Sequence, residues 1–176
     1  MLHASRITRY DTVMAQEIER KFLVIDDSWR GNIKRTDHII QGYLANTDRG
    51  SIRVRIANNE GTLSIKSMTL DISRLEYDYP IPLDDARNLI ASFSMQPVIE
   101  KLRHYIEDDK HIWEIDVFEK ENKGLIIAEI ELTDPEEVFH KPDWVGAEVS
   151  DDPRYYNVCL VEHPYQEWEK TGVGRT

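Results

Sequence analysis

Apolar and polar residues alternate with a period of two along most of the chain. Because successive side chains of a β-strand point to opposite faces, this alternation predicts strands. A turn composition at residues 58–61 separates two of the alternating stretches and is typical of a hairpin. We expect about eight strands, at residues 16–24, 39–45, 51–57, 62–67, 73–81, 98–107, 111–118 and 125–132.

Residues 83–93 have helical spacing instead, with Ala86, Leu89, Ile90 and Phe93 on one side of the expected helix. A cap residue followed by proline predicts two further helices, one beginning at 133–137 and one over 154–160. A short helix is also expected near Ser28. These elements predict a mainly β (α+β) protein, a closed eight-stranded antiparallel β-barrel with short helices packed outside.

The chain has 176 residues, enough for one domain with a substantial core and too few to expect two. We divide it into an N-terminal arm at 1–14, one barrel domain at 15–162 and a C-terminal tail at 163–176. Neither a membrane-spanning apolar stretch nor the apolar run of a signal peptide is found. The single cysteine, Cys159, excludes an internal disulfide and is expected in the core. These features together favour a cytoplasmic protein without membrane contact.

The polar face of the expected strands carries like charges two residues apart, whereas the opposite face is apolar. The residues that share this polar face are Glu17, Glu19, Lys21, Arg53, Arg55, Lys66, Arg74, Glu76, Lys101, Arg103, Glu114, Asp116, Glu129 and Glu131. Like charges at this spacing lie about 7 Å apart and repel each other unless something neutralises them.

The acidic and the basic side chains suit two different ligands, a divalent metal ion and a phosphate chain, which bind together at phosphoryl-transfer sites. Carboxylate oxygens are the ligands that Mg²⁺ prefers, whereas guanidinium and ammonium groups bind phosphate oxygens. A face that carries both kinds predicts a site for a metal ion and a short phosphate chain. The alternative is a solvated outer face of ion pairs. We favour the interior, because helices at 83–93 and near Val138 can cover the apolar faces from outside.

Overall charge and motifs narrow the class of ligand. The net charge of −11 argues against a nucleic acid as the main partner, although a local basic pocket can still bind a small phosphorylated molecule. The sequence has no glycine-rich phosphate loop of the Walker type, so side chains must bind the phosphates. The six histidines show no metal-ligand spacing.

The residues resemble the CYTH superfamily, the triphosphate tunnel metalloenzymes. The opening Glu-Ile-Glu-Arg-Lys at 17–21 matches the family signature Glu-x-Glu-x-Lys. An ordered series follows over roughly residues 15 to 160: Gln41-Gly42-Tyr43-Leu44, Arg53-Val54-Arg55, Leu63-Ser64-Ile65-Lys66, Ser73-Arg74-Leu75-Glu76-Tyr77, Glu100-Lys101-Leu102-Arg103, Glu114-Ile115-Asp116 and Ala128-Glu129-Ile130-Glu131-Leu132. The small bacterial members that this chain resembles tend to be triphosphatases, and small relatives are often dimeric, so the resemblance leaves a homodimer open.

The resemblance also implies roles, residue by residue. Phosphates would be held by Lys21, Arg53, Arg55, Lys66, Arg74, Lys101 and Arg103. One or two Mg²⁺ or Mn²⁺ ions would be bound by Glu17, Glu19, Glu129 and Glu131, with Glu76, Glu114 or Asp116 assisting. Relatives often carry Arg-Tyr-Lys-Asn near a short helix that closes the tunnel, whereas this chain has Tyr156 in place of the lysine.

The expected reaction is in-line attack of water on a terminal phosphorus of inorganic triphosphate or a related triphosphate compound. We expect Glu19, Glu131 and Lys101 to take part in catalysis, the first two by holding metal, and we assign no general base. Lys101 suits leaving-group protonation, although a plain phosphate contact is the favoured role. Three alternatives remain open: a class IV adenylate cyclase, a thiamine triphosphatase, and a polyphosphate- or nucleotide-binding module without turnover.

Overall fold

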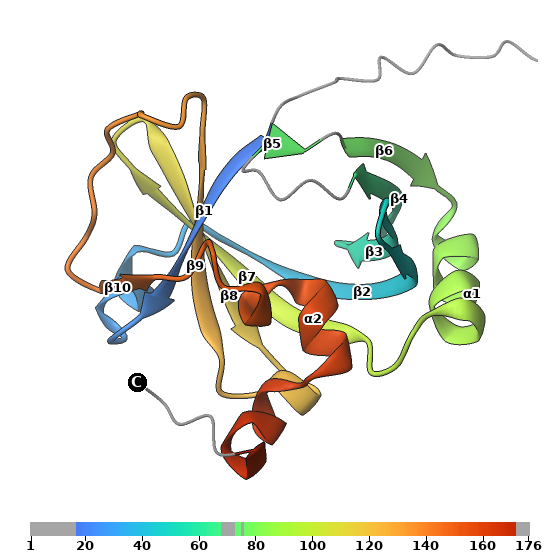
Figure 1. Cartoon of the computed structure of the whole chain (residues 1–176). Helices are drawn as coiled ribbons and strands as arrows, with labels where there is room; N and C mark the ends of the chain where they lie inside the picture. The colour runs from blue at the N-terminus through green and yellow to red at the C-terminus, as the bar shows by residue number, and fades with distance from the viewer. Residues whose placement is uncertain (1–16, 68–72, 75, 172–176) are drawn as a thin grey trace, which may run out of the picture.

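The computed structural model describes residues 17–67, 73, 74 and 76–171, and for residues 17, 73, 74 and 169–171 it describes the backbone alone. The strands of this part form one antiparallel sheet in the order β10-β1-β9-β8-β7-β2-β3-β4-β6, with β5 pairing on β1 (Figure 1). Their bounds are β1 (Glu17–Val24), β2 (Arg35–Thr47), β3 (Gly50–Ala57), β4 (Glu60–Ser67), β5 (Ser73–Arg74), β6 (Glu76–Ile81), β7 (Ile99–Asp108), β8 (His111–Phe118), β9 (Ile126–Leu132) and β10 (Val145–Glu148).

The sheet returns to its first strand. Only one residue separates β5 from β6 in the sequence; β5 pairs with β1 and β6 pairs with β4. β6, at one end of the strand path, is therefore followed back in sequence to β5 on β1, which lies next to β10 at the other end. The predicted antiparallel β fold with few helices is confirmed, with ten strands in the described part of the chain in place of the expected eight.

Several strand ends differ from the prediction by one or two residues, the strand expected at 73–81 is divided into β5 and β6, and two further differences have a clear cause. β2 begins at Arg35, four residues before the expected start, because Arg35 to His38 pair with β7 although their own sequence is polar throughout. β10 was not predicted, since its four residues do not alternate and it exists through pairing with β1.

Two α-helices and four 3₁₀ helices accompany the sheet. They are η1 (Ser28–Asn32), α1 (Leu83–Phe93), η2 (Lys120–Asn122), η3 (Pro153–Tyr155), α2 (Asn157–Glu162) and η4 (Tyr165–Thr171), all within the described part of the chain. The expected helices at 83–93 and near Ser28 are confirmed. The helix expected over 154–160 is split into η3 and α2, because Tyr156 has an extended backbone between them. Among the described residues, no helix has the length and apolar character that crossing a membrane requires.

The helix expected to begin at 133–137 is wrong. The segment makes a single turn, in which the Glu137 carboxylate accepts hydrogen bonds from the backbone N–H and the hydroxyl of Thr133, both at 2.7 Å. Val138 is 87% exposed and covers nothing, whereas Phe139 and Trp144 from the same loop pack on the apolar face.

The outer face of the barrel is covered in two patches. Trp113 is fully buried beneath the loop after β9, with its ring edge-on to those of Phe22, Phe139 and Trp144. On the other side α1 packs against β2, β3 and β4, where it buries Ala86 and Ile90 on Val54 (Figure 1). Burial of these apolar faces on the outside leaves the opposite, charged face to line the interior.

One end of the inner face is apolar. Ile127 pairs with Leu23 and with Asp116, so it shares the face of that aspartate, and Phe118 likewise shares the face of its partner Lys101. Together with Tyr43, Ile99 and other apolar residues they form a cluster with Leu160 and Val161 of α2. α2 therefore packs at one end of the interior and confines the charged surface to the rest of it.

The turn at Glu137 makes a prediction about stability. Hydrogen bonds from Lys110, Thr133 and His111 hold the pKa of Glu137 well below its usual range. A folded-state pKa below the unfolded value means that the ionised carboxylate stabilises the fold above about pH 4.3, and that this stabilisation is lost as pH falls through the folded pKa. Glu137→Gln should lower Tm at neutral pH, and the difference should shrink in acid.

Thermal unfolding of both proteins between neutral pH and about pH 3 measures this effect, because the difference in Tm should begin to shrink below the unfolded pKa and keep shrinking towards the folded pKa. Glu136→Gln is the matched control, since Glu136 is an exposed neighbour. An equal loss of Tm at every pH would show that the carboxylate charge does not matter.

Candidate active site

The strand register brings the predicted charges to one continuous face. Lys21 lies opposite Glu129, and Glu129 lies opposite Glu114; Asp116 lies opposite Arg103. Direct cross-strand partners point to the same side of a sheet. By this pairing the face carries Glu19, Lys21, Arg53, Arg55, Lys66, Glu76, Lys101, Arg103, Glu114, Asp116, Glu129 and Glu131. Glu17 and Arg74 pair through their backbones, and their side chains lie outside the described part.

The middle of this face is enclosed. Asp116 is fully buried, Lys101 is 2% exposed, Glu129 is 4% exposed, and Lys21 and Arg53 are each 9% exposed. Charges on a solvated outer face would be exposed and only loosely paired. The arrangement therefore excludes the alternative of an outward-facing ladder of ion pairs for these residues.

Carboxylates of β1, β8 and β9 form an acidic wall around buried cations. The Arg103 guanidinium is bidentate to Asp116, with both N–O distances 2.7 Å, and it also contacts Glu114 and Glu129. The two lysines pair in the same way: Lys21 Nζ lies 2.7 Å from Glu19 and contacts Glu129, and Lys101 contacts Asp116. This wall holds a dense network in which most carboxylates share a cation.

The pKa shifts in the acidic wall follow from burial set against these pairs. Burial opposes the charge of Glu129, but Lys21 and Arg103 outweigh it and hold the pKa of Glu129 well below its usual range. Burial lowers the pKa of Lys101 despite its partner Asp116, because Arg103 adds to the effect. Burial raises the pKa of Glu114. Arg103 lowers this pKa, but the nearby carboxylates raise it again, so the net shift is upward.

Like charges lie directly opposite each other within this wall. Glu19 faces Glu131 across β1 and β9, and Glu129 faces Glu114 across β9 and β8. Opposed carboxylates destabilise a sheet unless a cation lies between them. The oxygen-only donors and this spacing fit a divalent ion such as Mg²⁺ or Mn²⁺.

The wall formed by β3 and β4 is basic and far less neutralised. Arg53 Nη2 is 3.4 Å from Glu76 and 3.3 Å from the Ser64 hydroxyl, and Lys66 Nζ is 2.9 Å from the same Glu76. Arg55 makes no ion pair in the described part of the chain. Burial lowers the pKa of Arg55, the neighbouring cations Arg53 and Arg103 lower it further, and Asp78 and Glu76 offset only part of this effect. A partly buried guanidinium beside other cations suits an anion.

Glu76 lies among the basic residues rather than in the acidic wall, because it pairs with Arg53 and Lys66 on β3 and β4. Its position suits charge balance for a phosphate site more directly than metal binding beside Glu19.

Two polar residues on β2, Asp37 and Gln41, also stand on this face and were not among the predicted site residues. Asp37 is 5% exposed, accepts a hydrogen bond from Asn58 Nδ2 at 2.8 Å and lies 3.3 Å from Arg35. Gln41 is 1% exposed and lies opposite Arg55. The signal that could have found both is parity, since Asp37, Ile39 and Gln41 stand two residues apart on one strand.

Tyr156, which stands where relatives often have lysine, is directed to the backbone near β10. Its hydroxyl donates to the Ser150 carbonyl at 2.8 Å, and the Ser150 hydroxyl accepts from the backbone N–H of Lys21 at 2.9 Å. Tyr156 thereby connects the start of α2 to the strand that carries Lys21.

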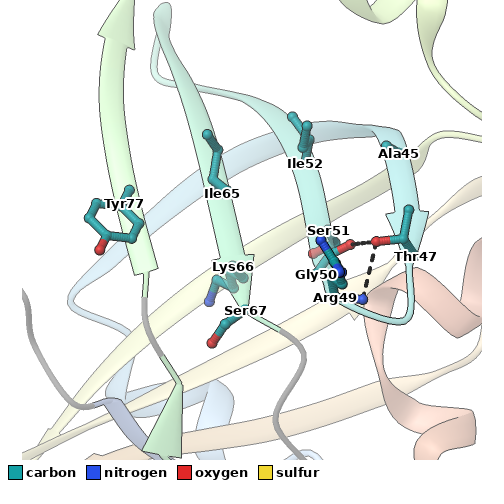
Figure 2. Close-up of a pocket in the computed structure, with 10 residues that line it drawn as sticks. All are labelled: Ala45, Thr47, Arg49, Gly50, Ser51, Ile52, Ile65, Lys66, Ser67 and Tyr77. Atoms are coloured by element: carbon teal, nitrogen blue, oxygen red, sulfur yellow. Dashed lines mark hydrogen bonds between the residues drawn. The ribbon is translucent and has the colours of Figure 1, made fainter.

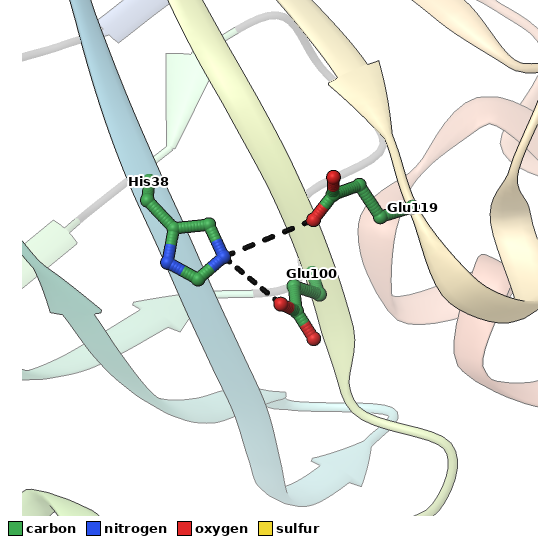
Figure 3. A group of neighbouring side chains, drawn as sticks. All are labelled: His38, Glu100 and Glu119. Atoms are coloured by element: carbon green, nitrogen blue, oxygen red, sulfur yellow. Dashed lines mark hydrogen bonds and ion pairs between the residues drawn. The ribbon is translucent and has the colours of Figure 1, made fainter.

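A second group of possible metal ligands lies on the outer face. His38 Nε2 is 2.9 Å from Glu100 and 3.8 Å from Glu119 (Figure 3). His38 pairs with Leu102, so it points away from Arg103 and the charged interior. Lys120 Nζ already lies 3.6 Å from Glu100. His38, Glu100 and Glu119 therefore form an ion-pair cluster on the outer face.

A groove of about 330 Å³ lies at the rim of β3 and β4. Ile52, Ile65 and Tyr77, side by side on neighbouring strands, belong to the outer apolar face (Figure 2). Ser51 and Lys66 of the same groove belong to the charged face. Its mainly apolar lining does not suit a polyanion, so the enclosed charges remain the candidate active site.

Comparison with known proteins agrees with this geometry. Residues 15–156 match the CYTH domain family. The chain is 45% identical over 157 residues to an inorganic triphosphatase of Acetivibrio thermocellus, covering 89% of this chain and all of that protein. It is 33% identical over 149 residues to an inorganic triphosphatase of Nitrosomonas europaea, covering 82% of this chain and 96% of that protein.

Solved structures share the fold. The crystal structure of an inorganic triphosphatase superimposes with a TM-score of 0.61 at 30% identity, over 84% of this chain and 95% of that one. A Pyrococcus horikoshii protein of 21% identity superimposes with a TM-score of 0.53, over 68% of this chain and 81% of that one. On its sequence, its strand order and these likenesses, the chain belongs to the CYTH domain family.

Proposed function

We propose that this protein is a metal-dependent phosphohydrolase whose substrate is inorganic triphosphate. The observation that carries the proposal is the pair of unlike walls in one interior. On β3, Arg53 and Arg55 stand on the charged face and Arg55 makes no ion pair in the described part of the chain, whereas carboxylates of β1, β8 and β9 gather on the other side of β7 and β2. A short chain of phosphates with a bound metal ion complements both walls.

The residues divide the work by their chemistry. Arg53 and Arg55 would bind phosphate oxygens through their guanidinium forks, and Lys66 would add a point charge beside Glu76. Glu19, Glu129 and Glu131 would hold Mg²⁺ or Mn²⁺, with Glu114 and Asp116 assisting. The ion, when bound, lowers the pKa of a water and neutralises charge on the phosphates.

The buried cations of the acidic wall have a different task. Lys21 and Arg103 hold the carboxylates in position, because each is bonded to two or more of them. Lys101 lies between this wall and the apolar end closed by α2, with its charge weakened by burial. That setting suits a lysine that contacts the leaving phosphate and excludes bulk water from it.

The two relatives support triphosphate as the substrate, since both are inorganic triphosphatases. The fold alone supports less, because it is shared with proteins below 25% identity.

The test is phosphate release from inorganic triphosphate, pyrophosphate, ATP and thiamine triphosphate with Mg²⁺ or Mn²⁺. We expect triphosphate to give the highest kcat/KM and to yield phosphate and pyrophosphate. Cyclic AMP and pyrophosphate from ATP would instead identify a cyclase. Tight binding of triphosphate without release of phosphate at any metal concentration would identify a binding module.

A further inference from the structure

Gln41 is a buried amide whose nitrogen has no hydrogen-bond partner. Its side chain is 1% exposed, and Nε2 makes no hydrogen bond in the structure. Gln41 stands on the charged face of β2, opposite Arg55 of β3 and Ile99 of β7. Buried amide donors in native proteins are nearly always paired, so this donor requires an explanation.

The surroundings of Gln41 supply donors rather than acceptors. Arg55 lies directly across the strand pair and makes no ion pair in the described part of the chain, although Asp78 and Glu76 partly offset its charge. Arg53, two residues before Arg55 on β3 and on the same face, has a buried Nε that is also without a hydrogen-bond partner. Unpaired donors therefore cluster on two adjacent strands, and the group that would satisfy them is an anion with several oxygens.

We propose that Gln41 binds the substrate, donating a hydrogen bond from Nε2 to a phosphate oxygen held between Arg53 and Arg55. The inference rests on the proposed function and adds a neutral contact to the charged ones. An amide contributes direction without charge, so its hydrogen bond is set by the position of the oxygen rather than by total substrate charge. Gln41 thus helps to fix the register of the phosphate chain along the basic wall.

The test compares Gln41→Leu, of similar volume without a donor, with Gln41→Glu, of the same shape with a repelling charge. Loss of a hydrogen bond to a charged group should lower kcat/KM for inorganic triphosphate by about 10–100-fold in Gln41→Leu. Gln41→Glu should lower it further, because a carboxylate repels phosphate. The rise in Tm on adding triphosphate should shrink in both variants, since this shift reports binding.

Stability separates this role from a structural one. Removing an unpaired donor should leave the Tm of ligand-free Gln41→Leu unchanged or higher, whereas a structural amide would lower it. Gln96→Leu is the control, because Gln96 is exposed. Wild-type kcat/KM with a wild-type triphosphate shift in Gln41→Leu would overturn the proposal, as would failure of both Gln41 variants to fold. A wild-type protein that binds triphosphate without hydrolysing it would refute the proposed function, and the Tm shift would still decide the role of Gln41.

Discussion

Replacing Arg55 by alanine should lower kcat/KM for inorganic triphosphate by about 10²–10³-fold, the usual loss when a positioned donor to developing charge is removed. Arg55 is partly buried and makes no ion pair in the described part of the chain, although Asp78 and Glu76 on β6 partly offset its charge. Its guanidinium can therefore bind phosphate without first breaking an internal ion pair. Steady-state kinetics with triphosphate and Mg²⁺ measure the loss.

Arg55→Lys should recover only part of the activity, because an ammonium group keeps the charge and loses the planar fork. Arg49→Ala is the matched control, since Arg49 is an exposed arginine at the turn that leads into β3. Wild-type kcat/KM in Arg55→Ala would remove the basic wall from the mechanism.

Arg55→Ala should lose activity without losing thermal stability. Burial and the neighbouring Arg53 and Arg103 lower the pKa of Arg55, so the folded state disfavours its charge. Removing a charge that the fold disfavours should leave Tm unchanged or raise it. A fall in Tm that accounts for the lost activity would mean that Arg55 is structural.

That the charges share one face could be predicted from sequence, because it depends on parity alone. Arg53 and Arg55 must share a face in any strand, and Val54 between them must take the other. The resemblance to CYTH proteins named the same residues independently of that argument. The sequence therefore predicts which side chains share a face, and only the strand register shows which of them lie directly opposite each other.

Features that depend on distant partners were not predictable in this way. Gln41 was quoted only within a family motif, because an unpaired amide is visible only when its surroundings are known. Asp37 stands in a polar run that becomes strand only by pairing with Arg103. The helix signal after Thr133 is local, but Glu137 also pairs with Lys110 and His111 from the β7–β8 turn, and this contact favours a single turn.

Removal of the divalent ion should abolish hydrolysis. Arg103 already contacts both Glu129 and Glu114, whereas Glu19 and Glu131 face each other across β1 and β9, so a divalent ion would relieve the repulsion of this second pair. With excess EDTA, phosphate release from triphosphate should fall to the uncatalysed background, and added Mg²⁺ or Mn²⁺ should restore it. An equal rate in EDTA would contradict the metal role.

Glu19→Ala identifies the wall that holds the ion. Glu19 is half-buried and pairs with Lys21, which keeps Glu129 as a second partner, so its loss does not leave a buried cation unpaired. The concentration of Mg²⁺ for half-maximal activity should rise by at least about 10-fold, because even supporting residues of metal sites have effects of this size. Glu121→Ala, at an exposed glutamate of η2, should keep the wild-type value. If Glu19→Ala lowered kcat/KM for triphosphate with no change in the Mg²⁺ requirement, Glu19 would act on the phosphates through Lys21 instead, and the ion would belong to Glu129, Glu131 and Glu114.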